Sequence, residues 1–180
     1  MSTYVVRHGE TAWSKTGQHT GRTDIPLTDE GEAQARSLAP RLRRDWALVL
    51  ASPLQRAWRT AELAGLDAQP EPDLVEWDYG PAEGRTTEEM STPDNPWRVW
   101  EATDLGESLE QVAARVRRVL DRIPATGDTL LVAHGHVLRV LTAVYLGLGP
   151  RAGQHLVLDP CRIGVLGLEH DWPALRGWNK

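Results

Sequence analysis

The sequence predicts an α/β fold with a mostly parallel central sheet and helices on both of its faces. Short apolar runs alternate with longer segments in which apolar residues recur at helical spacing. Three of these runs are followed within three residues by glycine or proline, as strands are where they pass into loops. The 180 residues, 41% of them hydrophobic, are enough for one domain with its own core.

The first strand and the first long helix are predicted near the N-terminus. Residues 3–6 form a β-branched and aromatic run that breaks at Arg7-His8-Gly9. Thr28 is a typical N-cap, and the acidic residues that follow it suit the positive end of a helix. Apolar residues then recur at helical spacing as far as Leu42, so we expect a helix from Thr28 to this point.

A second strand and a second helix are predicted next. Residues 47–51 are apolar throughout, which is typical of a buried strand. Ser52 and Pro53 are typical of an N-cap and a first helical position. We therefore expect a helix to begin directly after the strand, with Arg56 in its first turn.

Residues 67–106 differ from the rest of the chain. Prolines interrupt this stretch, which predicts loops with short helices, one of them over residues 96–101. We expect the segment to be an insertion that covers the core. Residues 1–180 then form a single domain with residues 67–106 as its cap.

The last third of the chain returns to the alternating pattern. Ser108 precedes a strongly periodic helix that extends to Ile123. Residues 129–133 are typical of a strand, which ends at His134-Gly135-His136 and leads into a helix that ends near Gly147. Two last strands are expected over residues 154–158 and 163–168.

Charge and cysteine content exclude several classes of protein. Twenty-five acidic residues against twenty basic ones give a net charge of −5, which argues against sequence-independent binding to nucleic acid or to an acidic membrane. The single cysteine, Cys161, excludes an internal disulfide and a cysteine-rich metal site. We find no apolar run of membrane-spanning length and no basic-then-apolar leader, so we expect a cytoplasmic protein.

Three predicted strand ends carry chemically active side chains. Arg7 and His8 follow the first strand, Arg56 lies shortly after the second, and His134 follows a later one. If these strands are parallel neighbours, two imidazoles and two guanidinium groups meet at one edge of the sheet. Burying such a cluster is costly without an anion. A phosphoryl group suits it, because arginine binds phosphate oxygens in pairs and an imidazole nitrogen can attack phosphorus.

The same residues lie in motifs that resemble those of the histidine phosphatase superfamily, also called the phosphoglycerate mutase-like family. The signature is Val6-Arg7-His8-Gly9-Glu10-Thr11, and matching blocks follow in order at residues 20–28, 51–57, 76–80, 106–109 and 133–135. Because the blocks span nearly the whole chain, the resemblance is specific at superfamily level. It implies a mostly parallel sheet with helices on both sides and a variable insertion over the pocket.

The resemblance also implies roles for individual residues. His8 would be the nucleophile that becomes a phosphohistidine, Arg7, Arg56 and His134 would hold the phosphoryl oxygens, and Glu76 would protonate the leaving oxygen and then activate water. Such a set supplies the charge stabilisation and in-line positioning that phosphoryl transfer needs. Further contacts to the substrate are expected from Gly9, His19, Thr20, Gly21, Arg22 and His136. No metal and no cofactor is expected.

Two reactions are open to such a site, because a phosphohistidine can pass its phosphoryl group to water or back to a bound sugar acid. Residues 81–106 contain only two basic side chains, and Ser14 and Arg22 stand where the mutases typically have Asn and Trp. We therefore expect a metal-independent phosphatase that hydrolyses small phosphomonoesters, sugar phosphates included, similar to small acid phosphatases. A cofactor-dependent phosphoglycerate mutase is the alternative.

Two further alternatives are less favoured. A catalytically idle phosphate-binding or regulatory module is disfavoured because all five core residues are present. The His134-x-His136 pair suggests a metal-dependent hydrolase, but no carboxylates at ligand spacing support it. For Arg139 the sequence favours neither the pocket nor an ion pair on the next helical turn. The partner is expected to be a small phosphorylated metabolite, and the resemblance is compatible with a homodimer as well as a monomer.

Overall fold

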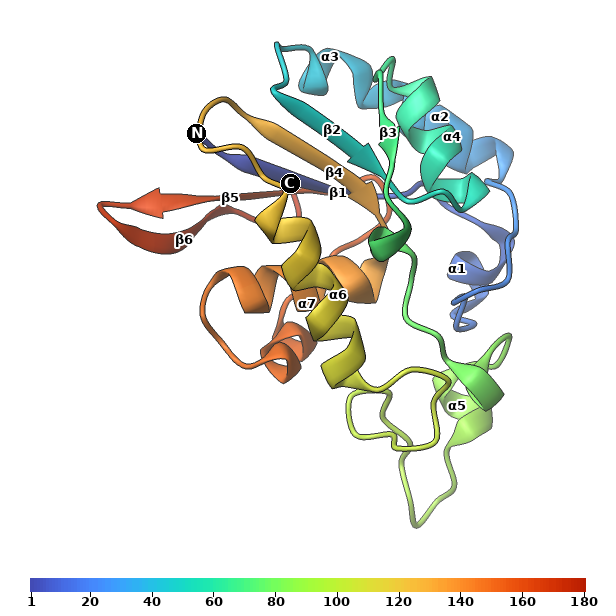
Figure 1. Ribbon diagram of the computed structural model, residues 1–180. Coiled ribbons are helices and arrows are strands. Elements are labelled where there is room, and N and C mark those ends of the chain that lie inside the picture. Colours follow the sequence, from blue (N-terminus) through green and yellow to red (C-terminus); the bar gives the residue numbers. More distant parts are fainter.

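The computed structural model describes residues 1–180 and contains one six-stranded sheet in the order β3-β2-β4-β1-β5-β6 (Figure 1). The strands are β1 (Thr3–Arg7), β2 (Leu48–Ala51), β3 (Gln69–Pro70), β4 (Thr129–Ala133), β5 (Ile163–Glu169) and β6 (Trp172–Gly177). Strands β3, β2, β4 and β1 are parallel, whereas β5 runs antiparallel to β1 and pairs with β6 as a hairpin. The predicted α/β fold with a mostly parallel sheet is confirmed.

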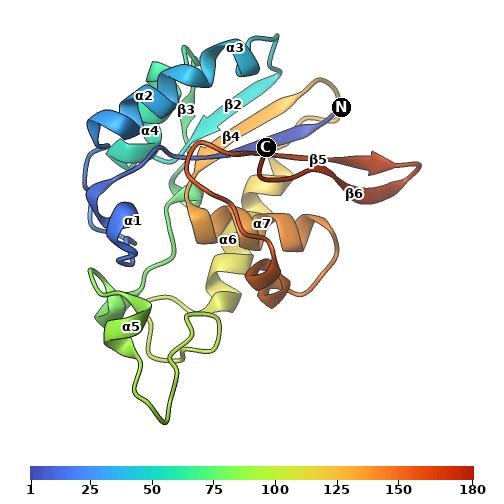
Figure 2. The ribbon, with the colours of Figure 1, turned by 180° about the vertical axis from the view of Figure 1, so that it is seen from behind.

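Helices cover both faces of the sheet (Figures 1 and 2). One layer holds α2 (Asp29–Ser37), α3 (Ala39–Leu42) and α4 (Gln55–Leu63), and the other holds α6 (Leu109–Asp121) and α7 (Gly135–Tyr145). Alternate residues of β1 serve the two cores: Val5 packs with α6 and α7, and Val6 packs with α2 and α3. All of β4 is buried, as expected for a central parallel strand covered on both faces.

The carboxyl ends of three parallel strands lie side by side, as the sequence predicts. Arg7 at the end of β1 pairs in register with Ala133 of β4, and Val132 of β4 pairs with Ala51 of β2. The loop after β1 is fixed by a direct backbone contact with α2. A Cβ atom on Gly31 would lie 2.1 Å from the carbonyl oxygen of Glu10, so only glycine allows the helix this close.

Residues 67–106 begin in the sheet and then leave it. They contain β3, the 3₁₀ helices η1 (Pro72–Leu74) and η2 (Gly80–Ala82), and α5 (Thr87–Met90). The prediction of a helix over residues 96–101 is wrong, because these residues form only a turn. The helix lies earlier, where Thr86 and Glu89 form a capping box that satisfies the first N–H groups of α5.

Three other predicted elements differ from the structure. The helix expected to run from Thr28 to Leu42 divides into α2 and α3 at Leu38, next to Pro40, which lacks the N–H that a continuous helix needs. Ser52 does not cap α4, which begins at Gln55 without a side-chain cap. Residues 154–158 form no strand, because η3 (Pro150–His155) occupies most of this stretch.

Several elements were not predicted, η3 among them. The helix α1 (Ala12–Thr16) follows β1, the short strand β3 pairs with β2, and the strand β6 completes the sheet beside β5. None of the helices is both long enough and apolar enough to cross a membrane.

Candidate active site

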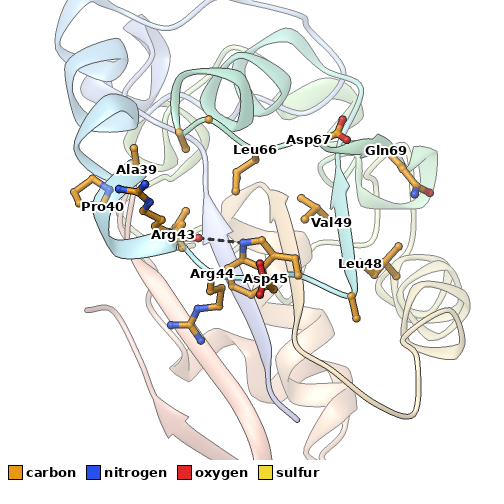
Figure 3. A pocket seen from close by; sticks show the side chains of 15 residues that line it. Ala39, Pro40, Arg43, Arg44, Asp45, Leu48, Val49, Leu66, Asp67 and Gln69 are labelled. Atoms are coloured by element: carbon orange, nitrogen blue, oxygen red, sulfur yellow. Dashed lines mark hydrogen bonds between the residues drawn. The ribbon is translucent and has the colours of Figure 1, made fainter.

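A cavity of about 270 Å³ opens at the carboxyl edge of the parallel strands. Six of the predicted site residues line it, namely Arg7, His8, His19, Thr20, Glu76 and His136. A larger hollow of about 850 Å³ lies at the amino end of β2, between α3 and the turn after α4 (Figure 3). That hollow is lined by two aspartates but by no histidine, whereas three histidines and a glutamate gather at the smaller cavity.

His8 presents an unprotonated nitrogen to this cavity. Its Nδ1 lies 2.7 Å from the carbonyl oxygen of Gly9, which only accepts, so Nδ1 carries the proton and Nε2 keeps its lone pair. Nε2 forms no hydrogen bond and is not an enclosed atom, so it opens on the cavity. Burial, and then the charges of Arg56 and Arg7, hold the pKa of His8 well below its ordinary value.

Arg56 is fully buried and does not itself line the cavity. Its Nε donates to Nδ1 of His134 at 3.1 Å, and its two terminal nitrogens donate to the carbonyl oxygens of Thr20, Gly21 and Thr23 at 2.8–3.1 Å. The guanidinium group therefore fastens the 20–23 loop to the end of β4. One Nη1 hydrogen has no partner in this arrangement.

His134 is neutral and packs against His8. Its Nδ1 accepts from Arg56, and its Nε2 donates to the hydroxyl of Ser52 at 2.8 Å. Burial and the charge of Arg56 hold its pKa well below the ordinary value. Its ring meets that of His8 edge to face, with 5.1 Å between centroids. Ser52, which the sequence suggested as a helix cap, thus serves to orient His134.

The 20–23 loop is held from its other side by Glu83. This carboxylate accepts hydrogen bonds from the backbone N–H groups of Gly21 and Thr23, at 2.9–3.1 Å. Gly21 also lies against the insertion, because a Cβ atom there would sit 2.4 Å from the carbonyl oxygen of Trp77. The loop is therefore clamped between an arginine below it and a glutamate of the insertion.

Glu76 is buried at the amino end of α7. Its Oε1 accepts from the backbone N–H groups of Trp77 and Val137, both at 2.9 Å, and its Oε2 accepts from that of His136 at 3.0 Å. A helix N-terminus favours a carboxylate at this position. Oε2 forms a single hydrogen bond, so it has a lone pair available to exchange a proton with a bound molecule.

Two imidazoles and a phenol form one wall of the cavity. The hydroxyl of Tyr79 lies 2.6 Å from Nδ1 of His136. Burial, reinforced by the nearby Glu76 charge, holds the pKa of Tyr79 well above its ordinary value, so the phenol donates this hydrogen bond. His136 then carries its proton on Nε2. His19 donates from Nδ1 to the carbonyl oxygen of Arg85 at 2.8 Å, and its ring lies 5.0 Å from that of Trp97.

Arg7, Gly9 and Arg22, three more of the predicted residues, differ in their contacts and in their position relative to the cavity. Arg7 lines it and donates to the carbonyl oxygen of Leu158 at 2.8 Å, while its Nε is enclosed without a partner. The N–H of Gly9 donates to the hydroxyl of Thr60 at 3.1 Å. Arg22 lies outside the cavity and faces Asp78 and Glu107 at 3.8 and 4.0 Å.

Several contributors to the site are absent from the sequence-based prediction. Thr60, Tyr79 and Glu83 act through contacts with residues far away in the chain, and no local pattern marks them. Arg139, for which the sequence favoured neither position, lines the cavity. No three His, Cys, Asp or Glu side chains lie close enough together to hold a metal ion.

Comparison with known proteins identifies relatives along the whole chain. The family model of the histidine phosphatase superfamily (branch 1) matches residues 3–180. An acid phosphatase of Mycobacterium tuberculosis is 38% identical, over 92% of this chain and 86% of that protein. A sedoheptulose 1,7-bisphosphatase of Saccharomyces cerevisiae is 32% identical, over 95% and 90%. Other relatives, 30–34% identical, are named probable phosphoglycerate mutases.

The fold has a similar counterpart among solved structures. The product of an open reading frame of Mycobacterium tuberculosis superposes with a TM-score of 0.91 and is 36% identical. The match covers 99% of this chain and 96% of that chain. The likeness therefore extends over both helical layers and the insertion.

The buried imidazoles predict a pH-dependent stability. His8, His134 and His136 all have pKa values well below the ordinary 6.5, with burial as the main cause, so the unfolded chain binds protons that the folded chain excludes. Above about pH 6.5 these histidines are neutral in both states, and the folded state is at its full stability with respect to them. As the pH falls below 6.5 the unfolded chain takes up protons, and the free energy of unfolding decreases. Urea unfolding midpoints measured from about pH 7.5 to about pH 5 test this expectation.

A pair of variants separates these histidines from other titrating groups. His136→Gln should reduce the proton uptake on unfolding by about one, and His155→Gln, at an exposed position, should leave it unchanged. An identical pH dependence in wild type and His136→Gln would contradict the assignment.

Proposed function

The chain belongs to the histidine phosphatase superfamily and is a phosphatase of small phosphate esters, and from this we propose that His8 carries the phosphoryl group between substrate and water. The single observation behind the proposal is the state of His8. Its Nδ1–H is fixed on a carbonyl oxygen, and its Nε2 lone pair opens on a cavity beside an arginine. A neutral imidazole held in this way is a nucleophile that needs no deprotonation.

In the first proposed step, Nε2 of His8 attacks phosphorus. The N–P bond forms as the bond from phosphorus to the ester oxygen breaks. Glu76, in its protonated form, gives the proton on Oε2 to the departing oxygen, so that a neutral alcohol leaves. Arg7 and the amino end of α7 face the charge that spreads over the phosphoryl oxygens.

In the second proposed step, water takes the place of the alcohol. The ionised Glu76 removes a proton from the water as the oxygen attacks phosphorus, and the N–P bond breaks. Phosphate leaves, His8 returns to its neutral form, and Glu76 again holds a proton. The chemistry is therefore complete with His8, Glu76 and the cationic groups around them.

Arg56 and His134 hold the phosphoryl site from beneath in this proposal. Arg56 is fully buried and does not line the cavity, so the support for its role is its charge and its bonds to His134 and the 20–23 loop. His134 reaches an oxygen only by releasing Ser52, so its ring acts chiefly to fix the plane of His8. Gly9 and Gly21 contribute backbone positions that hold His8 and Arg56.

The substrate is proposed to be a small phosphorylated metabolite. Residues 67–106 supply Glu76, Tyr79, Thr87 and Val99 to the cavity wall, which supports a capping role for this segment. A cavity of about 270 Å³ fits a small ester, and the relative that acts on a sugar bisphosphate supports sugar phosphates as one class. His19, Thr20 and His136 line the space beside the phosphoryl site. Cytoplasmic location and a homodimer stay predictions.

Replacing the nucleophile tests the proposal directly. His8→Ala should abolish phosphate release, and the acid-labile, base-stable phosphoenzyme formed by the wild type with ³²P-labelled ester should disappear. Activity of the wild type should survive excess EDTA. Replacing the exposed His155 with Ala serves as the control and should leave both signals in place. Full activity of a folded His8→Ala protein would contradict the mechanism.

The proton donor is tested by the quality of the leaving group. Glu76→Gln should slow hydrolysis of an alkyl ester such as glycerol 3-phosphate by roughly 10²–10⁴-fold. It should slow 4-nitrophenyl phosphate much less, because nitrophenolate leaves without a proton. Glu88→Gln, at an exposed position of α5, is the matched control. Equal losses on the two substrates would count against the acid role.

The relatives named as mutases make phosphoglycerate mutase the second candidate. The cavity lining favours the phosphatase, since neither basic side chain of residues 81–106, Arg85 or Arg98, reaches it. Incubation of the protein with 3-phosphoglycerate and trace 2,3-bisphosphoglycerate should release phosphate and form no 2-phosphoglycerate. Rapid formation of 2-phosphoglycerate would reverse this assignment.

A further inference from the structure

The arginines of this protein divide into paired and unpaired groups. Nine of the eighteen lie within 4.0 Å of a carboxylate: Arg22, Arg36, Arg44, Arg59, Arg98, Arg115, Arg118, Arg122 and Arg176. Most of the others are exposed and solvated. Only Arg7, Arg56 and Arg139 lack such a carboxylate and are also buried or half-buried. All three lie at the active site, where unpaired guanidinium groups are costly without a bound anion.

Arg139 is held rigidly in the cavity wall. It lies on α7, three residues after His136, and so on the same helix face. Its Nε donates to the carbonyl oxygen of Gly153 at 2.9 Å, and its Nη2 donates to that of Gln154 at 2.8 Å. The guanidinium carbon lies 4.9 Å from the ring centre of Trp100. Nη1 has no partner, so this pre-oriented group retains free N–H donors.

The charges at the site exceed what one phosphoryl group requires. Arg7 and Arg56 adjoin His8 and balance the two negative charges of a phosphate monoester. His8, His134 and His136 are neutral, because burial holds their pKa values well below the ordinary range. Glu76 is the only carboxylate that lines the cavity, and its oxygens accept hydrogen bonds from the backbone N–H groups of Trp77, His136 and Val137 instead of from a guanidinium group. Arg139 therefore forms no ion pair with a carboxylate of this protein.

Arg139 lies on the leaving-group side of the phosphoryl site. Glu76 contacts the first turn of α7 through the N–H groups of His136 and Val137, and Arg139 lies one turn further along the same helix. One helical turn advances about 5 Å. Glu76 and Arg139 both line the cavity, so a leaving group whose oxygen takes the proton of Glu76 shares this wall with Arg139.

We propose that Arg139 binds a second anionic group, a carboxylate or a second phosphate, on the leaving-group part of the substrate. The preferred substrates are then short phosphate esters that carry this second negative charge, and Arg139 is the residue that selects them. The proposal rests on the phosphatase activity proposed above and adds the chemical class of its substrate.

Matched pairs of substrates test this selection in the wild type. Glycerol 3-phosphate carries a hydroxymethyl group where 3-phosphoglycerate carries a carboxylate, and the two are otherwise identical. Fructose 6-phosphate and fructose 1,6-bisphosphate differ only in the second phosphate. In at least one pair, kcat/KM for phosphate release should be at least about tenfold higher for the substrate that carries the second anionic group. A gain of this size is expected from one charge-assisted hydrogen bond. The pair that shows the preference distinguishes carboxylate from phosphate.

Variants then assign the preference to a residue. In Arg139→Gln the ratio within the preferred pair should fall to about one, and Arg139→Lys should keep part of it because the charge remains. Arg151→Gln removes an exposed arginine outside this cavity, and the ratio should not change. Should Arg139→Gln fail to fold, the wild-type ratios and Arg139→Lys still decide the matter.

Three results would overturn the inference. Equal kcat/KM within both pairs in the wild type would show that no second anion is selected. A preference that survives in Arg139→Gln would show that another group binds it. Inactivity toward every ester, 4-nitrophenyl phosphate included, would instead contradict the proposed function on which the inference rests.

Discussion

The buried guanidinium group of Arg56 is the interaction on which the rest of the site depends. It donates four hydrogen bonds, one to His134 at the end of β4 and three to carbonyl oxygens of the 20–23 loop. Through His134 it fixes the ring against which His8 packs, and it also holds the 20–23 loop, which Glu83 of the insertion binds from the other side. A lysine has a single donor nitrogen and would lose this planar set of contacts. The sheet brings these elements to one edge, and Arg56 fastens them together.

The electrostatics of the site are arranged for an anion that arrives from solution. Arg7, Arg56 and Arg139 have no carboxylate partner, whereas half of the arginines of the chain form ion pairs. Burial, and then the charges of Arg56 and Arg7, hold the pKa of His8 well below its ordinary value, so the imidazole is unprotonated as a nucleophile requires. The one carboxylate in the cavity, Glu76, is hydrogen-bonded to the amino end of α7 and not to an arginine, and in the proposed mechanism it exchanges a proton with the leaving group. In the proposed mechanism the same arginine charges bind the phosphoryl group and help to keep the attacking His8 unprotonated.

Sequence predicted the strands that carry this chemistry better than the side chains that support it. Residues 3–6, 47–51 and 129–133 are apolar runs with clear ends, so their strands and the position of His8 and His134 follow from local pattern. Ser52 was misassigned because a serine before proline is typical of a helix start, while its actual partner, His134, is distant in the chain. Thr86 and Glu89 have the spacing of a capping box and mark α5, but the expected helix was placed at Pro96 instead. The bonds of Glu83, Thr60 and Tyr79 depend on how the insertion and the sheet meet, which no local pattern contains.

The central claim is that Nε2 of His8, backed by arginines, is the atom that receives the phosphoryl group. A crystal structure of the protein with orthovanadate, which adopts the trigonal-bipyramidal geometry of the transferring phosphoryl group, tests it most directly. The account predicts vanadium bonded to Nε2 of His8, with equatorial oxygens contacted by Arg7 and the apical oxygen opposite His8 facing Oε2 of Glu76. Vanadate bonded to another residue, or held in the cavity with Nε2 of His8 turned away from it, would contradict the account.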